Sequence, residues 1–172
     1  MLIRRSTDAD LDAIDEVHRR AFAAPGSTDE PIEVGLARAL RADVGWVPAL
    51  SLVAEDRDGR VVGHVVCTEG SLDGTRAVGL GPVGVLPELQ RRGVGSALVH
   101  AVLGAADALD VGVVVLLGHV DYYPRFGFVP AASLGIDAPD PEWGEHFQAR
   151  TLHAWTPGLR GGFRYAAPFE EL

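Results

Sequence analysis

The chain has 172 residues, of which 15 are basic and 24 acidic, so its formal net charge is −9. Every basic residue is arginine, and the chain contains neither lysine nor asparagine. The length suits one domain, expected over residues 1–172. Net acidity argues against binding to nucleic acid or an anionic membrane, because clustered positive charge supplies much of that affinity.

Several absences indicate a cytoplasmic protein. The apolar runs are far shorter than the roughly 20 residues that cross a bilayer, and no secretory signal opens the sequence. The single cysteine, Cys67, excludes an internal disulfide and suits a reducing compartment. We therefore expect no membrane partner and a cytoplasmic location.

The first half of the chain predicts a strand, two helices and a three-stranded meander. Apolar residues recur at helical spacing from Leu11 to Phe22, and a second helix begins around Pro31 and is broken by the segment Gly45 to Pro48. Asp-Gly pairs at 58–59 and 73–74 are strong hairpin signals. The strands expected here are Met1–Arg5, Ser51–Glu55, Val61–Cys67 and Arg76–Val85.

The second half opens with a long helix that starts at Gly93-Val94-Gly95 and ends by Asp110 to Gly112. The apolar run Val113–Leu117 predicts a buried strand parallel to its predecessor, because a strand–helix–strand crossover joins the two. A short helix should follow at Tyr122–Phe126 and an extended segment at Phe128–Pro130. We then expect a loop at Ala138–Trp143 and two closing strands at Thr151–Trp155 and Phe163–Ala166.

Two glycine clusters are candidates for binding phosphate. The segment 79–84 matches GxGxxG, but it lies inside a predicted strand and contains Pro82, so a structural role for these glycines is favoured. The second cluster, Gln90 to Ser96, lies between a strand and a helix. Its glycines leave free N–H groups at the positive end of the helix dipole, an arrangement that favours an anion.

The order of motifs resembles the GNAT family of acetyl-CoA-dependent N-acetyltransferases. A strand ending in Val83-Gly84-Val85 is followed by Pro87, a Q-x-x-G-x-G loop, a helix, an apolar strand and then Tyr122 to Phe128. The resemblance covers nearly the whole chain. It implies an α+β fold with a mixed, mostly antiparallel sheet, a central parallel strand pair splayed around the acetyl-CoA site, and helices on both faces.

The resemblance also implies which residues bind acetyl-CoA as co-substrate, without a metal. The loop binds the pyrophosphate, and the strand edge at 83–85 binds the pantetheine arm and polarises the thioester carbonyl. Tyr123 stands where family members often carry the acid that protonates the departing thiolate. The coenzyme-binding residues implied are Val83, Gly84, Val85, Gln90, Arg91, Arg92, Gly93, Val94, Gly95 and Ser96.

The base and the acceptor are less well defined by the sequence. Glu69, Glu33, His119 and water remain alternative proton acceptors, and Glu69 and Glu33 are named as catalytic candidates. The acceptor is expected to be a small-molecule or peptide amine, and family resemblance suggests a homodimer. Candidate residues of the acceptor pocket are Trp143, His146, Phe147, His153 and Trp155.

Two other functions compete with acetyl transfer. One is a catalytically silent coenzyme A-binding module with a regulatory role, which thiol-release assays would separate from an enzyme. The other is a nucleotide-dependent enzyme that uses the glycine loop, which predicts stronger stabilisation by ATP or NAD than by coenzyme A.

Overall fold

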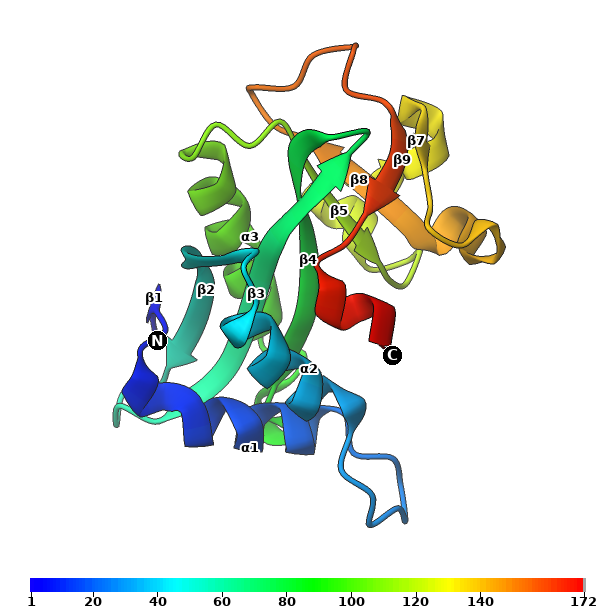
Figure 1. Ribbon diagram of the computed structural model, residues 1–172. Helices are drawn as coiled ribbons and strands as arrows, with labels where there is room; N and C mark the ends of the chain where they lie inside the picture. The colour runs from blue at the N-terminus through cyan, green and yellow to red at the C-terminus, as the bar shows by residue number, and fades with distance from the viewer. Residues whose placement is uncertain (172) are drawn as a thin grey trace.

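A computed structural model describes residues 1–171 as a mixed sheet flanked by helices (Figure 1). The main strand order is β1-β2-β3-β4-β5-β8-β6; β9 pairs with β3, and β7 pairs with β9. The strands are β1 (Leu2–Arg5), β2 (Trp46–Glu55), β3 (Val61–Leu72), β4 (Thr75–Val85), β5 (Val113–Leu117), β6 (Val129–Pro130), β7 (Ile136–Asp137), β8 (Phe147–Thr151) and β9 (Gly161–Arg164). The α-helices are α1 (Leu11–Ala21), α2 (Ile32–Ala42) and α3 (Val94–Asp107).

The predicted meander is confirmed, although its strands are longer than expected. Strands β2, β3 and β4 pair antiparallel in sequence order. Strand β2 begins at Trp46 rather than Ser51 and so contains Pro48. The register with β3 jumps between Trp46 and Ser51, so Pro48 lies in an irregular stretch where its missing N–H is tolerated.

The predicted parallel pair is also confirmed, and it is short. Strands β4 and β5 pair only through Val78 with Val114 and Gly79 with Val115. On its other side β5 pairs antiparallel with β8 along its whole length. Beyond Gly79, therefore, β4 and β5 part, and the two strands diverge visibly in Figure 1.

The helices cover both faces of the sheet. Helix α3 packs on one face, where a Cβ at Gly63 would lie 2.9 Å from Leu98. Helices α1 and α2 lie on the other face (Figure 1), and a Cβ at Gly84 would lie 2.9 Å from His18 on α1. Within residues 1–171 no helix is long and apolar enough to cross a membrane.

The C-terminal third differs from its predicted elements. The strand expected at Thr151–Trp155 is instead β8, which pairs with β5 and ends at Thr151. The second half of the expected loop Ala138–Trp143 belongs to a 3-10 helix, η5 (Pro141–His146), and a last 3-10 helix, η6, spans Ala167–Glu171. The sequence of β8, FQART, has weak strand propensity, so pairing with β5 rather than propensity determines its position.

Candidate functional site

A cleft of about 1480 Å³ opens where β4 and β5 part. Its walls come from β4, the loop before α3, the end of β5, η3 (Tyr123–Phe126), η5 and the C-terminal segment. Helices α1 and α2 close it from one face through Phe22, Glu33 and Leu36. One continuous cavity thus joins the glycine loop to the C-terminal third.

The edge of β4 inside this cleft is free of a strand neighbour. The Leu86 N–H donates to Val62 on β3, and successive residues of a strand point their backbone groups to opposite sides. Val85 and Val83 therefore direct theirs to the cleft, and the Val85 carbonyl accepts a 3.1 Å bond from the Gln90 side chain. Gly84 lies opposite His64 on β3 and faces α1.

The glycine loop has the backbone geometry of an anion site. Gly93, the N-cap of α3, has φ +86°, a left-handed conformation that favours glycine, and Arg91 has φ +58°. The first intrahelical bond runs from the Ala97 N–H to the Gly93 carbonyl, 2.9 Å. The N–H groups before Ala97, including those of Gly95 and Ser96, are consequently available to a ligand.

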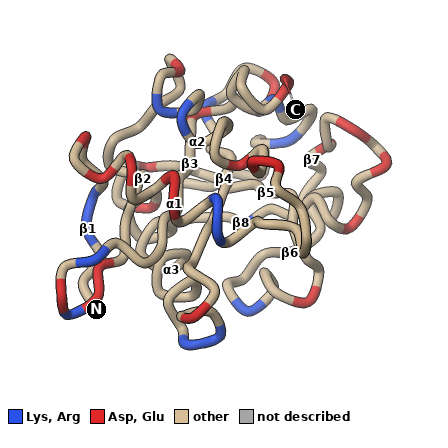
Figure 2. Tube along the Cα trace, turned by 90° about the horizontal axis from the view of Figure 1, so that it is seen from below, with Lys and Arg blue, Asp and Glu red and all other residues tan. Residues whose placement is uncertain are grey.

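Side chains of the loop divide between the cleft and its surroundings. Gln90, Arg91, Gly93, Gly95 and Ser96 line the cleft. Arg92 is exposed outside the cleft lining, and the Val94 side chain is buried in the core. Figure 2 shows short basic segments interleaved with acidic ones along the chain, so the positive charge at this loop is local.

Tyr123 lines the cleft from η3. Its ring packs against Gly118, where a Cβ would collide with it, and lies 5.8 Å from Phe128 in an edge-to-face arrangement. Burial is the main cause that raises the pKa of Tyr123 to about 12. The phenol therefore remains a proton donor throughout the neutral range.

The candidate bases are not all at the cleft. Glu33 and His119 line it. Glu69 does not, because β3 continues beyond the predicted end at Cys67 and holds Glu69 within the strand, opposite Val78. There its carboxylate forms a 2.8 Å ion pair with Arg76. The structure thus separates Glu69 from the other predicted catalytic residues.

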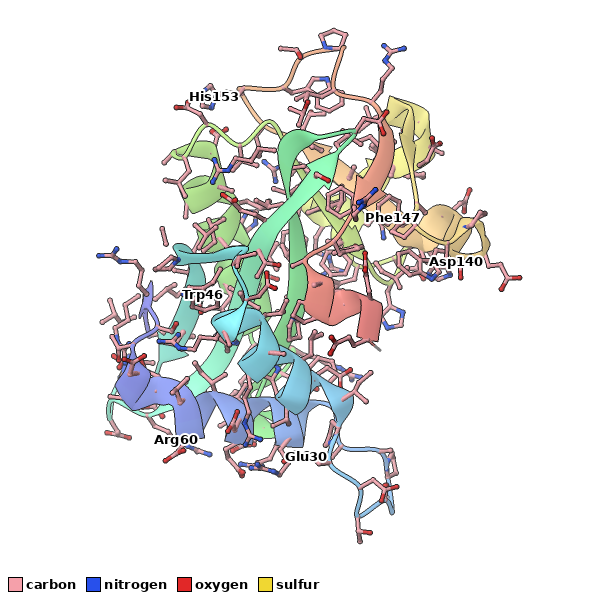
Figure 3. All side chains as sticks on the ribbon, in the orientation of Figure 1. Glu30, Trp46, Arg60, Asp140, Phe147 and His153 are labelled. Atoms are coloured by element: carbon pink, nitrogen blue, oxygen red, sulfur yellow. The ribbon has the colours of Figure 1, made fainter. Side chains whose placement is uncertain are left out.

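The cleft contains two of the five residues that the sequence suggests for an acceptor pocket. Trp143 and His146 line it, whereas Phe147 is buried behind Trp143 with ring centroids 5.9 Å apart. His153 binds Asp107 at 2.8 Å and lies near the upper edge of Figure 3, and Trp155 packs against the same core cluster as Trp143 and Phe147 without lining the cleft. Lining residues that sequence reasoning missed are Phe22, Glu142, Tyr165 and Phe169.

No three His, Cys, Asp or Glu side chains within residues 1–171 come together in a way that could hold a metal ion. The functional groups at the cleft are instead backbone N–H groups, arginines, phenols and carboxylates.

The central parallel strands of this mixed sheet part next to a glycine loop at the N-terminus of a helix. This arrangement is that of the acetyltransferase class of α+β proteins. Residues 48–130 match the family model described as an acetyltransferase (GNAT) domain. The chain belongs to the GNAT family of acetyltransferases.

Particular relatives cover almost the whole chain. An uncharacterized N-acetyltransferase of Escherichia coli K12, YjhQ, is 35% identical over 170 residues, covering 94% of this chain and 90% of that protein. The crystal structure of E. coli YhbS in complex with CoA has a TM-score of 0.87 at 30% identity and covers 98% and 91% of the two chains. A Brucella melitensis GNAT acetyltransferase in complex with acetyl-CoA has a TM-score of 0.76 at 32% identity, with coverage of 98% and 97%.

Proposed function

We propose that this chain transfers the acetyl group of acetyl-CoA to a small-molecule or peptide amine by direct attack of the amine on the thioester. The observation that carries the proposal is the cleft itself, which joins an anion-binding loop, a free strand edge and a buried phenol. Two relatives that match this chain over nearly their whole length were solved in complex with CoA and with acetyl-CoA, which supports the choice of coenzyme.

The pyrophosphate of the coenzyme would bind at the start of α3. Free N–H groups from Gly93 to Ser96 supply donors, and Arg91 at the cleft wall adds positive charge. The loop is stiffened where Gln90 bonds the Val85 carbonyl. Donors held in place before binding cost less ordering entropy when the coenzyme arrives.

The pantetheine arm would lie along the free edge of β4. The backbone groups of Val83 and Val85 point into the gap and suit pairing with the amides of the arm, as in strand addition. An N–H of this edge would also polarise the thioester carbonyl as negative charge develops on its oxygen.

Tyr123 would protonate the sulfur as the carbon–sulfur bond breaks. The amine nitrogen donates its electron pair to the carbonyl carbon, the C–S bonding pair leaves with sulfur, and the phenol proton moves to sulfur. The raised pKa of Tyr123 ensures that the proton is present at the start, and the acetylated nitrogen loses one proton in return. Glu33, His119 and water are the candidates to take the acceptor's proton from within the cleft.

The test is thiol release from acetyl-CoA over a panel of amines, combined with thermal-shift measurements with CoA, ATP and NAD. We expect transfer to at least one amine, and stabilisation by CoA that exceeds that by either nucleotide. Tyr123→Phe should lower turnover at least about a hundredfold while CoA affinity stays within about twofold. Saturable CoA binding without transfer to any amine would instead support a silent binding module.

A further inference from the structure

Tyr165 occupies a position next to the point where β4 and β5 separate. It follows β9 directly, and its ring lies over Gly79, where a Cβ would be 2.6 Å from Tyr165 Cδ1 and Cε1. Gly79 pairs with Val115 in the last bridge of the parallel pair. The ring therefore lies beside the inner end of the cleft, which it also lines.

The hydroxyl of Tyr165 is buried and has no hydrogen-bond partner within residues 1–171. A buried polar group without a partner destabilises a fold, and phenylalanine would fill the same space without that cost. The oxygen is also shielded from bulk water. Because Tyr165 also lines the cleft, the partner that this hydroxyl lacks is a group that binds there and displaces the atoms covering the oxygen.

Aromatic neighbours hold the phenol in one orientation. Its ring centroid lies 4.8 Å from that of Phe163, 4.7 Å from Phe169 and 6.3 Å from Trp143. Burial raises the pKa of Tyr165, so the hydroxyl keeps its proton at neutral pH. It can thus accept one hydrogen bond and donate another.

Tyr165 and Tyr123 approach the cleft from opposite faces of the sheet. Tyr123 packs on Phe126, which contacts His100 of α3. Tyr165 packs on Phe169, which lies against α2 on the other face of the sheet. A thioester placed between the parted strands would have one phenol on each side.

We propose that the Tyr165 hydroxyl binds the attacking amine and directs its electron pair at the thioester carbonyl, opposite the sulfur that Tyr123 serves. This inference rests on the proposed acetyl transfer. The N–H of the amine donates to Tyr165 Oη, the nitrogen forms the new C–N bond, and the C–S bond breaks toward Tyr123. Tyr165 keeps its own proton throughout, so its role is to position the acceptor.

The variant Tyr165→Phe tests this role, and Thr68→Val is its matched control. Thr68 Oγ1 is another buried hydroxyl without a partner in the described residues, it lies beside Gly79 on the same face, and Thr68 does not line the cleft. The assay is thiol release with tyramine, 1,5-diaminopentane, phenethylamine and a peptide with a free N-terminus. The variant should be compared on whichever of these wild type acetylates fastest.

Tyr165→Phe should lower kcat/KM for the amine about tenfold, the usual effect of losing one hydrogen bond, mainly through a higher KM. CoA binding should be unchanged, and the melting temperature should hold or rise because a buried orphan hydroxyl is removed. Thr68→Val should keep wild-type kinetics. Equal kinetics of Tyr165→Phe and wild type, or an equal loss in Thr68→Val, overturns the proposal.

A crystal structure with acetyl-CoA decides the question even if none of the four amines is acetylated. A hydrogen bond of about 3 Å and an attack distance of about 3.5 Å require Tyr165 Oη within roughly 6 Å of the carbonyl carbon. A thioester beside Tyr123 but farther than that from Tyr165 overturns only this inference. A coenzyme bound outside the cleft overturns the proposed function as well.

Discussion

Mild acid should destabilise the protein through a buried pair of histidines. His18 Nε2 lies 2.8 Å from His64 Nδ1, and His64 Nε2 lies 3.0 Å from the Ser51 hydroxyl. Both rings are fully enclosed between α1 and β3. Burial lowers the pKa of His18 from 6.5 to about 4 and lowers that of His64 well below its usual value.

The direction of the change in stability follows from the pH at which the folded and the unfolded chain each bind a proton. Below about pH 6.5 the unfolded chain protonates histidines that the folded chain keeps neutral, so the stability present above that pH is lost as the pH falls toward 4. For His18 alone, a drop from 6.5 to about 4 at about 1.4 kcal/mol per pH unit corresponds to about 3 to 4 kcal/mol in full. His64 adds to the loss in the same direction, because burial and repulsion from a charged His18 lower its pKa while the unfolded chain still binds its proton, so the His18 figure is a lower bound.

The assay is urea unfolding from pH 8 to pH 4 at constant ionic strength. We expect the free energy of unfolding to fall by at least about 2 kcal/mol at pH 5 and at least about 3 kcal/mol at pH 4, which is the share of His18 alone. The double variant His18→Gln/His64→Gln should lose most of this slope. His153→Gln should keep it, because His153 is an exposed residue whose pKa Asp107 raises. Parallel pH profiles for wild type and the double variant would refute the reasoning.

Three further substitutions probe the cleft. Gly95→Ala would place a Cβ 3.2 Å from the Tyr122 hydroxyl, so we expect CoA affinity to fall about tenfold in calorimetry while helix α3 gains up to about 1 kcal/mol in stability. Gly118→Ala would push the Tyr123 ring aside, and turnover should fall about tenfold in the thiol-release assay with a smaller change in CoA binding. Arg91→Gln should weaken CoA binding several-fold and make it less sensitive to salt, because the attraction between Arg91 and the anionic coenzyme, which salt screens, is removed. Binding would be measured at about 50 and about 300 mM salt.

Local signals in the sequence were sufficient for most of the fold. Asp-Gly turns predicted the hairpins, and the helix between two apolar strands predicted the parallel pair, which the structure confirms. Strand ends were less predictable, because β3 runs on to Leu72 through pairing with β4 and β9. That extension is why Glu69 lies within a strand beside Arg76 rather than at the cleft.

The glycine-loop wall of the cleft was also more predictable than its other walls. The loop residues are close in sequence, and their glycines carry a conformational signal that the left-handed Gly93 matches. The other walls include Phe22, Glu142, Tyr165 and Phe169, which lie far apart in the chain. No local pattern brings such residues together, and the unpartnered state of the Tyr165 hydroxyl is visible only in three dimensions.

The bare edge of β4 lies in the middle of the sheet rather than at its rim. An unpaired strand at a rim invites pairing with another chain and hence aggregation, but here β5 begins beside the same edge and limits what can enter. A polypeptide strand carries side chains on both faces and is wide, whereas a slender chain with amides and no side chains can slide between the walls. Under the proposed function, the gap between the two strands would exclude peptide segments and admit the thin amide-bearing arm of the coenzyme.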